Sequence, residues 1–88
     1  MTEKPIDKLH PTDQAAVYEV QKKLKEETAT AHDIGVIMRV AQQNVSAFGN
    51  FGLTLILRIA EVHFQGRKKV DYIYTLENLN AAFGLDRN

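Results

Sequence analysis

The chain of 88 residues lacks cysteine and tryptophan, and it has no long hydrophobic run. Without cysteine there are no disulfides and no thiolate metal ligands, and nothing indicates an oxidising compartment. The longest apolar stretch, residues 53–57, is interrupted by Thr54 and is far too short to span a bilayer. The polar N-terminal sequence MTEKPIDKLHPTD has no apolar segment of the kind that signal peptides contain. We therefore expect a cytoplasmic protein with no membrane partner.

The formal net charge is zero, because eleven basic residues balance eleven acidic ones. A neutral chain is not typical of general polyanion binders. The charges are unevenly placed, however, with a net −2 over residues 1–38, +4 over residues 39–69 and −2 over residues 70–88. The basic middle segment indicates either a partner or chance clustering in a short chain. A chain of this length forms one small domain with a modest core.

The N-terminal residues 1–10 are polar and have few apolar anchors, so we expect a flexible arm followed by a single domain over residues 11–88. Pro11 is suited to the first turn of a helix, and Thr12 is suited to cap its amide groups. This first helix should end near Glu27. Its apolar residues recur at helical spacing, at Ala16, Val17, Val20 and Leu24.

A second helix is expected from Thr30, because Thr30 and Asp33 match the capping-box pattern. We expect this helix to end near residues 39–40 and a third helix to begin around Gln42. Gly35 is a weak helix former, and its lack of a side chain allows a neighbouring helix to approach closely. The third helix would turn Val45, Phe48, Phe51 and Gly52 inward.

Residues 53–64 fit two structures, because their apolar residues match both the alternation of a strand and the spacing of a helix. We expect a helix as far as Leu57 or Ala60 and then a strand. Residues 65–69, QGRKK, form a short polar segment with a glycine between two β-rich runs. That pattern predicts a β-hairpin.

A last helix is expected over residues 75–85, with Thr75 as its cap and Gly84 at its C-terminal end. The expected order is helix, helix, helix, hairpin, helix, which is an α+β fold. The alternative, if the hairpin does not form, is an all-α helical bundle.

The expected order resembles that of the winged helix-turn-helix regulators, and the distance from Ser46 to Gly66 is similar to that in the small bacterial repressors of the arsenic-repressor type. The residues that carry the resemblance are 30-TAHDIGVIMRVAQQNVSAF-48, as helix, turn and recognition helix, and 62-VHFQGRKKVDYIYTL-76, as the wing. The resemblance implies a transcriptional regulator that binds double-stranded DNA, usually as a homodimer on a near-palindromic site. The first and last helices would form the dimer surface.

By position, the resemblance assigns DNA contacts to three groups of residues. The start of the recognition helix would read bases, since Gln and Asn pair with adenine in the major groove, and it comprises Gln42, Gln43, Asn44 and Ser46. Arg39 would contact the DNA backbone at the turn. The wing tip would contact phosphates through Arg67, Lys68 and Lys69.

The same residues also have a plainer interpretation, as a solvated helix start, a solvated hairpin tip and core aromatics. The rival function is a protein-interaction module, or small adaptor, that docks a larger partner through an apolar surface at Phe48, Phe51 and Leu53. The sequence shows no carboxylate pair, no Ser/His/Asp set and no phosphate-binding glycine loop. We therefore expect no enzymatic activity and no cofactor, and the three scattered histidines, His10, His32 and His63, predict no metal site.

Overall fold

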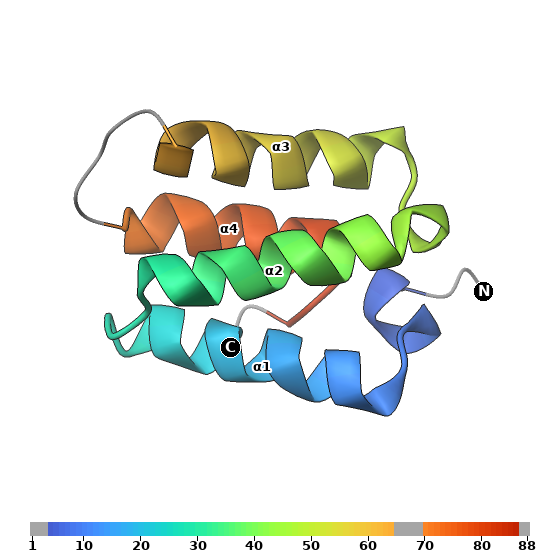
Figure 1. The fold of residues 1–88 in the computed structure, drawn as a ribbon, viewed down its shortest axis with the longest axis horizontal. Coiled ribbons are helices and arrows are strands. Elements are labelled where there is room, and N and C mark those ends of the chain that lie inside the picture. Colours follow the sequence, from blue (N-terminus) through green and yellow to red (C-terminus); the bar gives the residue numbers. More distant parts are fainter. Residues whose placement is uncertain (1–3, 65–69, 87–88) are drawn as a thin grey trace.

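The computed structural model describes residues 4–64 and 70–86, and it describes His63 and Phe64 by their backbone alone. Every regular element in these residues is helical (Figure 1). Short 3-10 helices occur at η1 (Pro5–Lys8) and η2 (Val45–Ala47). The α-helices are α1 (Pro11–Lys25), α2 (Ala31–Gln43), α3 (Asn50–Phe64) and α4 (Tyr72–Phe83). The expected α+β fold is therefore wrong, and the alternative, an all-α bundle, is what the described residues form.

The helices form an antiparallel bundle in which each one runs opposite to the next along the chain (Figure 1). Helix α1 packs against α2 and α4, and α3 packs against the same two helices from the other side. The centre of the core consists of side chains that are almost completely buried, Val17, Val20, Leu24, Ile34, Ile37, Val40, Ile59, Leu79 and Phe83. The rings of Phe48 and Phe83 meet edge to face, with centroids 5.1 Å apart, a favourable geometry for an aromatic pair.

The expected change from helix to strand after Leu57 does not occur, because α3 continues to Phe64. In a strand, Leu55, Leu57 and Ile59 would share one face. In the structure Leu55 and Ile59 are buried whereas Leu57 is 67% exposed, as the turn of a helix requires. The helical pattern prevails because it buries Leu55, Ile56 and Ile59 against the rest of the bundle.

The second strand of the expected hairpin is also wrong, because the alternating residues after Val70 belong to the first turn of α4. Asp71 caps this helix, and its side chain accepts a hydrogen bond from the Tyr74 amide at 3.1 Å. Such a cap satisfies an amide that has no partner within the helix. Thr75, the expected cap, is instead buried inside α4.

Two of the expected helix boundaries are confirmed. Thr30 caps α2, and its amide donates a hydrogen bond to Asp33 Oδ2 at 2.8 Å in a capping box. Gly84 ends α4 with a φ of 74°, a left-handed conformation that glycine adopts without steric cost. Helix α1 starts at Pro11 as expected, but its cap is His10, whose Nδ1 accepts a hydrogen bond from the Thr12 amide at 3.2 Å.

The expected break near residues 39–40 is wrong, because α2 continues through Gln43. Val40 and Ala41 are both buried, and they extend the apolar stripe of Ile34 and Ile37 by another turn. The third helix accordingly begins at Asn50 and not at Gln42. Of the residues expected to point inward, Phe48 and Gly52 are buried, whereas Val45 and Phe51 are exposed.

The segment expected to be a flexible arm contributes two core residues. Ile6 and Leu9 are only 3% and 4% exposed. The Gln14 side chain also donates a hydrogen bond to the carbonyl of Ile6 at 2.8 Å. From Pro5 onward the N-terminal segment is thus part of the packed domain.

Candidate functional site

An apolar groove lies on the surface between α2 and α3, and we call it the α2–α3 groove. Its volume is about 300 Å³, and its lining is Met38, Ala41, Gln42, Val45, Leu53, Ile56 and Leu57. Two of these residues project into solvent, since Val45 is 49% exposed and Leu57 is 67% exposed. Large apolar side chains gathered at a surface hollow are typical of interaction sites.

The spacing of residues along the two helices explains why the groove forms. On α2 and the turn after it, Met38, Gln42 and Val45 are separated by four and then three residues, and Gly35 continues this spacing toward the N-terminus. On α3, Leu53 and Leu57 are four residues apart. Residues at such intervals lie on one face of a helix. This stripe lies beside the buried stripe of each helix, so both helices present apolar residues outward as well as inward.

The electrostatics of the groove are simple. Among the described residues that line it, none is charged, and Gln42 carries the polar group. Arg39 and Arg58 are exposed on α2 and α3 but lie outside the lining. An apolar partner could therefore fill the groove without removing a charge from water, which would be costly.

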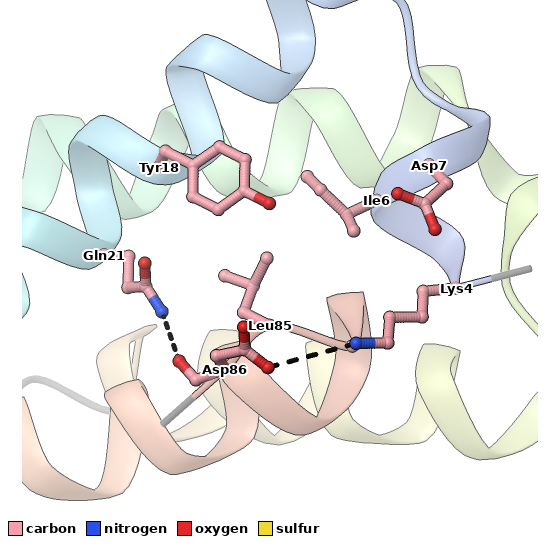
Figure 2. Close-up of a pocket in the computed structure, with 8 residues that line it drawn as sticks. Lys4, Ile6, Asp7, Tyr18, Gln21, Leu85 and Asp86 are labelled. Carbon is pink, nitrogen blue, oxygen red and sulfur yellow. Dashed lines mark hydrogen bonds and ion pairs between the residues drawn. The ribbon is translucent and has the colours of Figure 1, made fainter. Parts of the chain in front are cut away.

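A second hollow is polar and lies where the two ends of the domain meet (Figure 2). Its volume is about 310 Å³, and its lining is Lys4, Ile6, Asp7, Tyr18, Gln21, Gly84, Leu85 and Asp86. Gln21 Nε2 donates hydrogen bonds to Asn80 Oδ1 at 2.9 Å and to the carbonyl of Asp86 at 3.0 Å. These bonds join α1 to α4 and to the segment after it, so we assign Gln21 a structural role.

The ionic contact in this polar hollow is weak. Lys4 Nζ and Asp86 Oδ1 are 4.0 Å apart, and both side chains are mostly exposed. Exposed ion pairs contribute little to stability. The contacts around this hollow therefore join the N-terminal segment and α1 to the end of α4. We assign these contacts a structural role.

The ion pair between Lys23 and Asp33 is better shielded than the Lys4 pair. Lys23 Nζ lies 3.2 Å from Asp33 Oδ1, and the Asp33 side chain is 7% exposed. Burial by itself raises the pKa of Asp33, but the hydrogen bonds from the Thr30 amide and from Lys23, together with the charge of Lys23, outweigh it and lower the pKa. The pair holds α1 to the start of α2.

The residues expected to read DNA bases do not start a helix. Gln42 lines the α2–α3 groove, and Gln43 is exposed at the last turn of α2. Asn44 ends α2, and its side chain donates hydrogen bonds to the carbonyl of Val40 at 2.8 Å and to Asp13 at 3.3 Å. Ser46 is exposed within η2.

Of the remaining DNA-contact residues, Arg39 lies beside Gln42 and Gln43 on α2, where it is exposed one turn before them. The expected wing-tip residues Arg67, Lys68 and Lys69 lie outside the described residues.

Phe48 and Phe51 do not form the expected apolar surface together. Phe48 is 7% exposed and packs on Phe83, whereas Phe51 is 72% exposed at the start of α3. Of the groove residues, Leu53 was expected in an apolar surface, whereas Met38 and Leu57 were not. The regular spacing of Leu53 and Leu57 was the signal that could have revealed them, once α3 was taken as a helix throughout.

Within residues 4–64 and 70–86, no three potential ligands lie close enough together to hold a metal ion. None of the described helices has the length and the apolar character needed to cross a membrane. Comparison of the chain with protein-family models, with curated proteins and with solved structures gives no match.

Proposed function

We propose that this protein is a protein-interaction module whose contact surface is the α2–α3 groove. The observation that supports the proposal is the uncharged lining of the groove, with Val45 and Leu57 left 49% and 67% exposed at its edge. A small protein gains stability by covering such side chains, because apolar burial contributes about 25 cal/mol per Å². Full burial of a leucine contributes about 1.5–3 kcal/mol, and most of that remains available at Leu57.

The partner of the groove is helical and apolar on the side that makes contact. The groove runs between two antiparallel helices, and residues at helical spacing form both of its walls. A helix with apolar residues three and four positions apart matches such walls, which is the usual mode of recognition in a helical groove. The uncharged lining selects an apolar seam and not an acidic or basic one.

This proposal replaces DNA binding as the preferred function. The DNA hypothesis depended on a recognition helix that begins near Gln42, and α2 is continuous at that point. Gln42 itself contributes to an apolar groove, which is poorly suited to a polyanion. DNA binding is therefore an alternative outcome of the test and not part of the proposal.

Photo-crosslinking in the cells that naturally produce the chain tests the proposal. One variant carries a photoreactive residue at Gln42 in the groove, and a matched control carries it at Glu19, which is exposed on α1. We expect Gln42, but not Glu19, to crosslink to an apolar helical segment, and we expect Leu57→Glu to abolish the crosslink. Equal crosslinking from both positions, or crosslinking from Gln42 to nucleic acid, would contradict the proposal.

A further inference from the structure

We infer, on the basis of the proposed function, that the partner in the α2–α3 groove is a second copy of this chain, related to the first by a two-fold axis. In such a dimer each copy presents the same surface to the other, so the surface must be complementary to itself. Three properties of the groove meet that requirement: its shape, its charge and its single polar group.

The first property is the shape of the face. The hollow of about 300 Å³ and the projecting side chains of Val45 and Leu57 lie side by side on one face. A two-fold rotation places the projecting residues of one copy over the hollow of the other, and the reverse contact follows by symmetry. Leu57 then packs against the α2 and α3 residues of the second copy in the manner of a knob in a hole.

The second property is the charge. No charged side chain occurs among the described lining residues, and the whole chain has a net charge of zero. Two linings therefore meet without burying an unpaired charge, and the exposed Arg39 and Arg58 lie outside the contact that the linings make. A chain with a large net charge of one sign would repel its own copy, and it would favour a partner of opposite charge.

The third property is the polar group. Gln42 lies between Met38 and Val45 in the α2 wall of the groove. Its amide is both a hydrogen-bond donor and an acceptor, so two copies of Gln42 are able to satisfy each other. An axis near the middle of the groove brings the two amides together. A single buried amide of this kind fixes the register of packed helices.

The size of the face is also sufficient. A stable dimer covers about 800 Å² on each partner, which is roughly one-seventh of the 5777 Å² surface of this chain. The described bundle measures 38 × 23 × 20 Å, so its long sides are large enough to hold a contact of that size, of which the groove lining is one part. Two α2–α3 pairs that face each other make a second antiparallel arrangement of four helices across the axis, a common packing.

Gly35 provides room for this contact at one end of the face. A Cβ at Gly35 would meet nothing within 4 Å in the described part of the chain, so no neighbour inside the domain accounts for a glycine in the middle of α2. Glycine at this position allows a helix from outside the domain to approach the α2 backbone closely.

Sedimentation equilibrium tests the inference on three proteins between about 10 µM and 1 mM, a range that detects moderate to weak dimers. We expect the wild type to approach twice the 9.9 kDa chain mass. Leu57→Glu should raise the dimer dissociation constant at least about tenfold, since it would bury a charge in the interface. The matched control is Ile73→Glu, because Ile73 is 73% exposed on α4 and should leave the dimer intact. Circular dichroism confirms that both variants remain folded.

Disulfide trapping locates the axis. The chain has no cysteine, so Gln42→Cys introduces a unique thiol, with Glu19→Cys as its control. Oxidation should link two chains through position 42 and not through position 19, because a disulfide requires Cα atoms within about 7 Å. A dimer that survives Leu57→Glu, or that links through position 19 and not through position 42, would overturn the inference.

The outcomes distinguish this inference from the proposed function. If the wild type is monomeric at 1 mM, roughly the weak limit of biological association, the second copy is not the occupant. The proposed function still stands in that case if the residue at position 42 crosslinks to another helical protein. If neither a second copy nor another protein contacts position 42, both the inference and the proposed function are wrong.

Discussion

The sharpest stability prediction concerns Gly84, where an added Cβ is crowded, and Gly35, where it is not. Substitution by alanine should therefore change stability in opposite directions at the two positions. At Gly84 the backbone has a φ of 74°, and an added Cβ would lie 2.8 Å from the Cβ of Lys4. At Gly35, in the middle of α2, an added Cβ would meet nothing within 4 Å in the described residues. Gly84→Ala should therefore destabilise the protein, and Gly35→Ala should stabilise it.

The magnitudes follow from the local geometry. An L-residue in the left-handed region costs about 1–2 kcal/mol, and the contact with Lys4 adds to this cost because Cβ atoms do not approach so closely. We expect Gly84→Ala to lower the free energy of unfolding by about 1–3 kcal/mol. In the Leu57→Glu background, where no second copy contacts α2, Gly35→Ala should raise the free energy of unfolding by about 0.5–1 kcal/mol, since alanine is the better residue in a helix interior.

Urea denaturation, followed by circular dichroism, measures both effects, and both substitutions are made in the Leu57→Glu background because dimerisation would otherwise add to the apparent stability. In a thermal melt of the same variants, a change of 1 kcal/mol should move the melting temperature by about 4–8 °C in a domain of this size. If Gly84→Ala were neutral, the packing of the N-terminal segment against Gly84 would be wrong. If Gly35→Ala lowered the free energy of unfolding in the Leu57→Glu background, the result would contradict the open space around Gly35.

Three further substitutions test the capping box and the aromatic core. Because the fold lowers the pKa of Asp33, its carboxylate stabilises the protein above the unfolded-state pKa of about 3.9, and this stabilisation is lost as the pH falls through the lower folded-state pKa. Asp33→Asn should lower the free energy of unfolding at pH 7 by about 1 kcal/mol, and this free energy should then decline less steeply in acid. Urea titrations at pH 7 and about pH 3 measure both changes. If stability declined in acid as steeply as in the wild type, the stabilising role of the Asp33 carboxylate would be contradicted. Phe48→Ala should cost about 3–5 kcal/mol because it empties a buried site, whereas Phe51→Ala, at a residue 72% exposed, should stay within about 0.5 kcal/mol in thermal unfolding. Similar losses for the two phenylalanines would contradict their placement.

The helix boundaries that were predicted correctly depend on interactions between residues close in sequence. Thr30 and Asp33 are three residues apart, and together they satisfy amide groups at the start of α2. Gly84 ends α4 because its own conformation favours glycine. Signals of this kind are complete within one turn of a helix, so they can be read without knowledge of the tertiary fold.

The boundaries that were predicted wrongly depend on packing between distant parts of the chain. The apolar pattern around Leu55 and Leu57 fits a strand and a helix equally well, and only the contacts of α3 with α2 and α4 favour the helix. Tyr72 and Tyr74 alternate as in a strand, but Asp71 begins α4 just before them. The strand prediction at α4 was thus wrong because Asp71, and not Thr75, caps this helix.

The α2–α3 groove could not be predicted while α3 was divided into a helix and a strand. Its two walls come from Met38 and Val45 on one side and from Leu53 and Leu57 on the other. These residues meet only when α2 runs to Gln43 and α3 starts again at Asn50. The protein-interaction hypothesis located its apolar surface at Phe48, Phe51 and Leu53, and the structure shows that Phe48 is a core residue.

The rate at which a single thiol reacts in the groove tests the central claim most directly. Cysteine is introduced singly at Gln42 in the groove and at Glu19 on α1, both exposed in the isolated chain, and each is allowed to react with a thiol reagent at increasing protein concentration. If the groove is a docking surface for a second copy, reaction at position 42 should slow at least about tenfold, which corresponds to about 1.4 kcal/mol of protection. Reaction at position 19 should not change. Equal rates at both positions across the whole range, with or without extract from the producing cells, would contradict the claim that the α2–α3 groove is covered by a partner.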